Sequence, residues 1–86
     1  MRKLYPSTKF VDEVTFSEQL EHIFSEMEEV TEEIEKKNTP KLLMELCDLE
    51  HSIQTALEIA EKKHGIDIEH IRSLVFKKND ERGYYK

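Results

Sequence analysis

The sequence predicts an all-α protein in which an antiparallel helical hairpin is followed by a third helix. The composition, 37% hydrophobic and 37% charged with two Gly and two Pro, suits amphipathic helices better than a sheet or a disordered tail. Apolar residues recur at three- and four-residue steps along two long segments, which is the period of a helix face. Helix-breaking sequences separate the segments, at "NTP" and at Gly65.

The first 14 residues differ from the rest of the chain. They show no sustained period and include Pro6, so we expect an extended N-terminal arm over residues 1–14. The segment "KFVDEVTF" is a weak candidate for a strand. Residues 15–86 are expected to form one helical domain, because 86 residues are too few to bury a second core.

The first long helix is predicted to begin after Thr15. Thr15 and Glu18 have the spacing of a capping box, in which each side chain accepts from the other's backbone N–H. The helix should end near Lys36 and Lys37, whose charges suit a helix C-terminus. Its apolar stripe comprises Phe16, Leu20, Ile23, Met27, Val30 and Ile34.

The second helix is predicted to begin with Thr39 as cap and Pro40 in the first turn, and to end before Gly65. Its stripe comprises Leu42, Leu46, Leu49, Ile53, Ala56, Leu57 and Ala60. About 24 residues span roughly 36 Å, whereas a compact monomer of this size has a radius of gyration of about 12 Å. We therefore expect a four-helix-type bundle completed by oligomerisation, as a homodimer or homotetramer.

The third helix is predicted to start at Asp67, whose side chain can cap it. Its apolar side consists of Ile68, Ile71, Leu74 and Val75. Three helices with long apolar stripes and no fourth to close them again favour self-association.

Composition excludes several classes of partner. The net charge of −6 argues against a nucleic-acid polymer, which needs a clustered basic patch. No apolar run approaches the length of a membrane span, and "MRKLYPSTKF" lacks the apolar core of a signal peptide. The single Cys47 lies in an apolar run and is expected to be a buried thiol in a reducing compartment. The expected location is the cytoplasm.

Two acidic pairs have the same spacing on the two long helices: Glu26 with Glu29, and Glu45 with Asp48. Relative to its apolar stripe, the first pair lies at about 65° and 125°, and the second at about 70° and 130° in the same sense. Both pairs are also symmetric about residue 37, at the predicted turn. Four carboxylates should therefore converge, and such a cluster needs a cation to offset its charge. Oxygen ligands favour Mg²⁺ or Mn²⁺ over zinc.

A second register is possible, because Glu29 and Glu32 have the same spacing at nearly the same level. Glu32 points almost directly away from the apolar stripe, so we prefer Glu26 and Glu29. The other glutamates of this helix are expected to form a solvated face: Glu28, Glu32, Glu33 and Glu35. The four histidines show no mutual metal-ligand spacing and are expected at the surface or at helix ends.

A basic segment near the C-terminus contains Lys78, Asn79 and Arg82. Lys78 and Arg82 share a helix face, and Arg can grip a phosphate with two parallel hydrogen bonds. Gly83 permits a turn that returns the two tyrosines after it over a ligand. By itself the segment is more typical of a solvated helix end, where cations are favoured by the helix dipole. Beside a metal site, separate cations of this kind are what a polyphosphate ligand requires.

From about residue 16 to its end, the chain resembles the all-α nucleoside triphosphate pyrophosphohydrolases, the superfamily of MazG, the dimeric dUTPases and phosphoribosyl-ATP pyrophosphohydrolase. The motifs of this resemblance are "EMEEV", "ELCDL" and "KKNDERGYY". Many members have a further glutamate where this chain has Ser25, and a small residue where it has Glu28.

The resemblance implies hydrolysis of a nucleotide between its α and β phosphates, giving a monophosphate and pyrophosphate. It implies that Mg²⁺ is held by Glu26, Glu29, Glu45 and Asp48, one of which accepts the proton of the attacking water. Lys78 and Arg82 would then offset charge on the leaving pyrophosphate, and Asn79 would help to position the substrate.

The base remains open at this point: canonical or damaged deoxynucleotides, dUTP and phosphoribosyl-ATP are all compatible. Two other interpretations also remain. One is a non-catalytic helical interaction module with a merely solvated acidic face, and the other is a family member that binds nucleotide without turnover.

Overall fold

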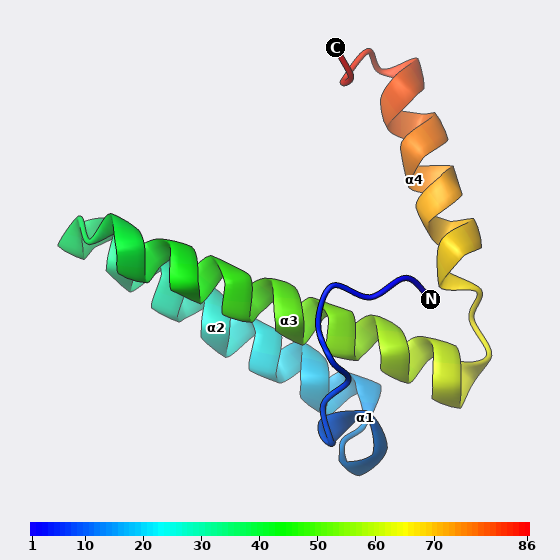
Figure 1. The fold of residues 1–86 in the computed structure, drawn as a ribbon, viewed down its shortest axis with the longest axis horizontal. Coiled ribbons are helices and arrows are strands. Elements are labelled where there is room, and N and C mark those ends of the chain that lie inside the picture. Colours follow the sequence, from blue (N-terminus) through cyan, green and yellow to red (C-terminus); the bar gives the residue numbers. More distant parts are fainter.

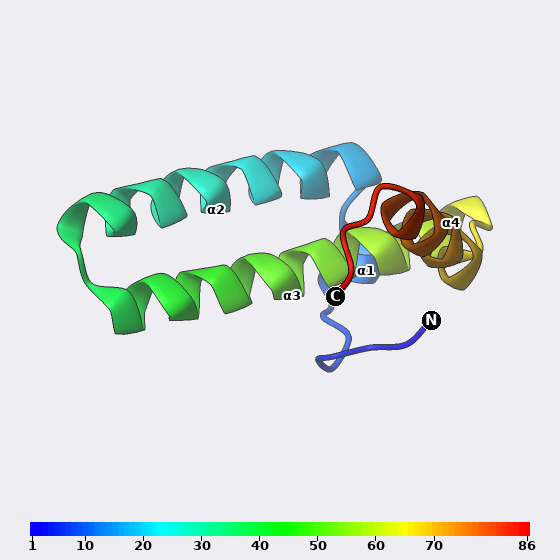
Figure 2. The same ribbon diagram turned by 90° about the horizontal axis from the view of Figure 1, so that it is seen from above.

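The computed structural model describes all 86 residues and contains helices but no strand. Helices α2 and α3 lie side by side and antiparallel in both views (Figures 1 and 2), and α4 leaves the far end of α3. This confirms the predicted hairpin with a further helix. The elements are α1 (Phe10–Glu13), α2 (Phe16–Lys36), α3 (Thr39–His64) and α4 (Ile68–Glu81).

Most predicted helix ends are confirmed. Thr15 and Glu18 form the capping box, and Pro40 occupies the first turn of α3. Gly65 ends α3 in the left-handed region at φ 66°, where a residue with a Cβ is strained. Asp67 caps α4 by accepting from the His70 N–H.

The cap of α3 was predicted wrongly. Asn38, not Thr39, is the capping residue, and its Oδ1 accepts from the Lys41 N–H at 3.2 Å. Asparagine is among the best N-cap residues because its short side chain reaches the orphan N–H groups of the first turn. Lys37 takes the left-handed conformation that ends α2.

The N-terminal arm crosses α3 (Figure 1) and ends in the single turn α1. The strand candidate "KFVDEVTF" is therefore wrong, because this chain offers no sheet edge for a strand to pair with. Gln54 of α3 anchors the arm by accepting from the N–H groups of Leu4 and Tyr5 at 2.8 and 3.0 Å. Thr8 and Thr55 share a hydrogen bond of 3.2 Å.

Helix α4 projects away from the end of α3 rather than packing along the hairpin (Figure 1), and Figure 2 views it nearly end-on. The arm tethers its first turn: the Arg2 N–H donates to Glu69 at 3.0 Å, and Arg72 donates to the Arg2 carbonyl at 3.2 Å. The radius of gyration is 14.9 Å, larger than the value of about 12 Å for a compact chain of this length.

The fully apolar core is small and lies where the arm meets the hairpin. Its members are Val11, Ala56, Ile59 and Ile68, and Ile59 is completely buried. Val11 comes from α1, Ala56 and Ile59 from α3 and Ile68 from α4, so this core holds three elements together.

The two long helices face each other through only part of the apolar stripes that the sequence analysis placed at their interface. Stripe residues that are half-buried are Phe16, Ile23 and Val30 of α2 and Leu42 and Leu49 of α3. The buried residues of α2 are Gln19, Glu26 and Glu33, whereas Leu20, Met27 and Ile34 are exposed. Large apolar side chains are also exposed on α3 and α4, namely Leu43, Met44, Leu46, Ile53, Ile71, Leu74, Val75 and Phe76. An apolar surface of this extent is typical of a protein that associates.

Cys47 is exposed rather than buried. It lies in the apolar run that the sequence analysis assigned to the core, but α2 leaves that part of α3 uncovered, as the exposure of Leu46 shows. No helix has both the length and the apolar content that a bilayer crossing demands.

Candidate active site

The hairpin places the four predicted carboxylates at two neighbouring levels, each level with one residue from α2 and one from α3. Glu26 and Asp48 line one cavity of about 200 Å³. Glu29 lies against Glu45, one helical turn closer to the loop between the helices. Each pair thus takes one member from each helix, as the symmetry about residue 37 requires.

Glu45 has the most perturbed environment of the four. Burial raises the pKa of its carboxyl, and the neighbouring charges of Glu29 and Asp48 raise the pKa further. Lys41 acts in the opposite direction. Both main causes disfavour a negative charge at this place, so a cation near Glu45 would relieve an existing electrostatic cost.

Glu26 is buried at the helix interface and is held by two further side chains. Ser52 Oγ donates to Glu26 Oε1 in a short hydrogen bond, and His22 Nε2 lies 3.0 Å from the same oxygen. The sequence analysis gave His22 no role. Its position four residues before Glu26, and that of Ser52 four residues after Asp48, could have indicated the cluster.

Glu33 is not part of a solvated face, contrary to the sequence analysis. It is 5% exposed, and its Oε1 lies 3.5 Å from Lys36 Nζ and 3.8 Å from Lys41 Nζ. Its Oε2 is buried without a hydrogen-bond partner. Glu33 faces α3 because it lies seven residues, about two turns, after Glu26. Glu28, Glu32 and Glu35 are exposed, as expected.

The carboxylates form two pairs rather than a closed cage. No three His, Cys, Asp or Glu side chains converge closely enough in the structure to hold a metal ion. The chemistry of the donors nevertheless fits a hard divalent ion, because all four ligands offered by Glu26, Glu29, Glu45 and Asp48 are carboxylate oxygens.

On α2, the acidic residues and the exposed apolar residues lie on opposite sides of Glu26, which faces α3. Counting about 100° per residue from Glu26, His22 and Glu29 lie about 40° and 60° to one side, and Ile34 and Met27 about 80° and 100° to the other. A partner could therefore cover the apolar stripe without covering the carboxylates.

The predicted phosphate-binding residues are far from the carboxylates of the same chain. Glu45 lies 19 residues before the end of α3, which corresponds to about 28 Å, and α4 then turns away (Figure 1). Lys78 and Arg82 share one face, as expected, since the Arg82 N–H donates to the Lys78 carbonyl at 3.2 Å. The structure does not bring them to Glu45 within one chain.

The turn at Gly83 is present, with φ 73°. It brings Tyr85 back onto Phe76, with the ring centroids 5.1 Å apart, and places Arg82 5.9 Å from the centre of the Tyr84 ring. The Tyr84 N–H donates to the Asn79 carbonyl at 3.0 Å. The basic segment is thus an ordered structure at the end of α4.

Comparison with known families identifies the arrangement. A family model described as the MazG nucleotide pyrophosphohydrolase domain matches residues 14–84. The chain belongs to this family. The MazG match spans both carboxylate pairs and the basic segment, and it leaves the first 13 residues outside. No curated protein and no solved structure matches the chain.

Membership gives the general activity, which is that of a nucleotide pyrophosphohydrolase. The carboxylate oxygens of α2 and α3 have the chemistry that suits a hard divalent ion. The finer assignments are proposals.

Proposed function

We propose that the protein hydrolyses a nucleoside triphosphate between the α and β phosphates in a Mg²⁺-dependent reaction, giving a monophosphate and pyrophosphate. The observation that carries the proposal is the placement of carboxylates across the two helices of a MazG-family chain: Glu29 lies against Glu45, and Glu26 and Asp48 line one cavity. Like charges held this close are unfavourable unless they serve a cation.

The four carboxylates are the proposed metal ligands. Bound there, Mg²⁺ (or Mn²⁺) would neutralise charge on phosphate oxygens and lower the pKa of the attacking water. A carboxylate that is not fully engaged accepts the proton of that water. Ser52 and His22 hold Glu26 in place from both helices, so they would position this ligand.

Lys78, Asn79 and Arg82 are proposed to bind the pyrophosphate part of the substrate. Because about 28 Å of α3 separates Glu45 from the root of α4, these residues would come from another copy of the chain, in a homodimer or homotetramer. The exposed apolar side chains of α2, α3 and α4 supply the contact surface that such an assembly needs.

The first test is the release of pyrophosphate from a panel of nucleoside triphosphates with Mg²⁺, and with EDTA in its place. We expect release only with the metal. Glu45→Gln should lower kcat/KM at least about 100-fold, because it removes a charged ligand. Glu35→Gln is the matched control, since Glu35 is an exposed glutamate outside the site. Undiminished release by folded Glu45→Gln would refute the proposed site.

A mixing experiment tests whether the cations come from another copy. Glu45→Gln and a Lys78→Ala, Arg82→Ala double variant are each expected to be nearly inactive. Co-expressed in equal amounts, they should recover about a quarter of the wild-type activity, since a quarter of randomly assembled sites combine two intact halves. A site built within one chain would recover nothing.

An interaction module without catalysis makes different predictions. Its folding would be indifferent to Mg²⁺, and no nucleotide in the panel would release pyrophosphate. A member that binds nucleotide without turnover would instead show metal-dependent nucleotide binding and no release.

A further inference from the structure

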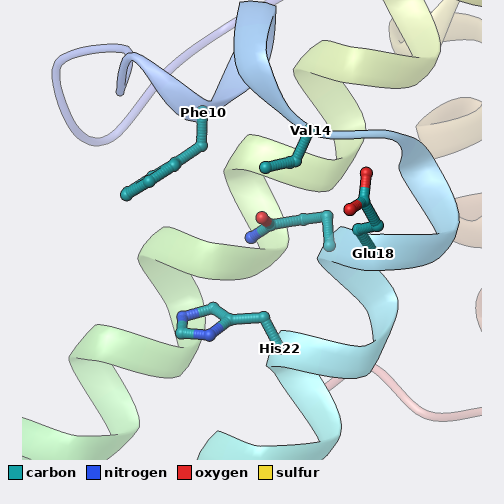
Figure 3. Close-up of a pocket in the computed structure, with 5 residues that line it drawn as sticks. Phe10, Val14, Glu18 and His22 are labelled. Atoms are coloured by element: carbon teal, nitrogen blue, oxygen red, sulfur yellow. The ribbon is translucent and has the colours of Figure 1, made fainter.

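A recess lies between the N-terminal arm and the start of α2 (Figure 3). Its volume is about 160 Å³, and its walls are Phe10, Val14, Glu18, Gln19 and His22. In Figure 3, Phe10 projects from the arm and His22 from α2 toward the same side, and Val14 lies beside Phe10. Glu18 is engaged elsewhere, accepting from the Thr15 N–H in the capping box.

This recess continues into the cavity that is lined by Glu26 and Asp48. The two cavities share Phe10, Gln19 and His22, and the second is also lined by Glu26 and Asp48. An elongated ligand can therefore have one end at the acidic pairs and the other between the two rings.

Polar groups line the passage between the two ends. Gln19 is 5% exposed, and its Nε2 donates to the Ser52 carbonyl at 3.0 Å. This bond fixes the amide and leaves its Oε1 free to accept from a ligand. Thr8 and Thr55 place hydroxyls on the wall of the same cavity.

We propose that this recess holds the nucleoside of the substrate, with the base between the Phe10 and His22 rings and the Gln19 amide beside it. The proposal rests on the proposed function, in which the triphosphate lies at Glu26 and Asp48. A base presents a flat face to aromatic side chains whatever its identity, and stacking is a strong source of affinity. The amide can accept from an amino or imino group on the edge of the base.

The arm is held firmly enough to present Phe10. Tyr5 stacks on His51 with the ring centroids 4.6 Å apart, and His51 Nε2 lies 3.2 Å from the Pro6 carbonyl. At the other end of α1, Lys63 donates to the Val14 carbonyl at 2.9 Å. Phe10 lies outside the MazG match, so the base pocket depends on a segment that the family model does not describe.

Phe10→Ala tests the pocket. Phe10 is 45% exposed, so its truncation should leave the fold intact. We expect KM for the preferred nucleoside triphosphate to rise about tenfold, because a stacking partner of the base is lost, while kcat changes less than about threefold. Phe10→Tyr should restore the wild-type KM. Inhibition by inorganic tripolyphosphate, which has no base, should be unchanged.

Leu4→Ala is the matched control, since Leu4 is an exposed apolar residue of the same arm that lines neither cavity. Its KM should equal that of the wild type. An unchanged KM in Phe10→Ala, or an equal loss of tripolyphosphate inhibition, would overturn the pocket.

A binding measurement separates this inference from the proposed function. Calorimetry with a nucleotide whose α–β bridging oxygen is replaced by CH₂ needs no turnover. Weaker binding to Phe10→Ala than to Leu4→Ala supports the pocket even if no substrate is hydrolysed. If the wild-type protein hydrolyses nucleotides but both variants bind the analogue equally well, the base pocket is rejected and the proposed function stands.

Discussion

The two ends of the α2–α3 hairpin differ in the kind of side chain that they bury. At the end that carries the arm, the buried side chains are apolar: Val11 of α1, and Ala56 and Ile59 of α3. Toward the loop between the helices, the buried side chain is Glu33, Glu29 lies against Glu45, and Leu43 and Ile34 face solvent.

The contrast teaches where the chain depends on something outside itself. Burial of apolar surface stabilises the arm end without help. The loop end keeps like charges at its helix interface and leaves its apolar residues uncovered, so a cation and a second chain are the agents that would stabilise it. The proposed catalytic site lies in this dependent half.

The largest expected effect is the difference in stability between two truncations to alanine, one in each half of the hairpin. Ile59→Ala should lower the free energy of unfolding by about 2–5 kcal/mol, because it opens a cavity in a small core. Leu43→Ala removes a side chain that is 55% exposed and should change the stability of the isolated chain by less than about 0.5 kcal/mol. Urea unfolding at low protein concentration, followed by circular dichroism, measures both. Equal losses would mean that the two ends do not differ.

The second-largest expected effect is the stabilisation of the loop end by Mg²⁺. At ten times its Kd, a ligand that binds only the folded state adds about 1.4 kcal/mol, and for a chain of this length that raises Tm by about 5–10 °C. Differential scanning fluorimetry with Mg²⁺ and with EDTA measures the shift. Glu45→Gln should lose most of it, whereas Glu35→Gln should retain it. A wild-type Tm that does not depend on Mg²⁺ would contradict the metal site.

The smallest effect concerns pH, and its sign should differ between the two ends. The pKa of Glu69, at the arm, is lowered by the Arg2 N–H and by Arg72. Its contribution is therefore present above the ordinary value of 4.5 and lost as pH falls through the folded-state pKa. The pKa of Glu45 is raised, so stability falls as pH rises from 4.5 through its folded-state pKa.

Urea midpoints in EDTA at pH 7.5 and pH 4 separate the two carboxyls. At pH 7.5, Glu69→Gln should be slightly less stable than the wild type and Glu45→Gln slightly more stable. Glu69→Gln should also lose less stability on acidification than the wild type does. A change of the same sign in both variants at pH 7.5 would refute this distinction.

Helix positions could be predicted from the sequence because they depend on local chemistry. The capping box at Thr15, the proline at position 40 and the glycine at position 65 each act within a few residues of themselves. The pairing of acidic residues across the hairpin could also be anticipated, because a short loop fixes which levels of two antiparallel helices meet.

Which face each helix turns to its neighbour could not be predicted in the same way. Hydrophobic periodicity locates an apolar stripe but does not say whether the same chain or another covers it. We assigned the whole stripe to the hairpin interface, whereas only part of it lies there, and this placed Glu33 and Cys47 wrongly. The base recess was also missed, because it needs Phe10 of the arm beside His22 of α2, and no local pattern links these residues.

Because α4 projects away from the end of α3 (Figure 1), a small change of angle at its first turn produces a large displacement at its last turn. Its 14 residues span about 21 Å, so a rotation of about 10° at its root would displace its far end by about 4 Å. The bonds that Arg2 makes with Glu69 and Arg72 restrain that angle. Contacts of the Arg2 backbone near the N-terminus thereby restrain the positions of Lys78 and Arg82 at the far end of α4.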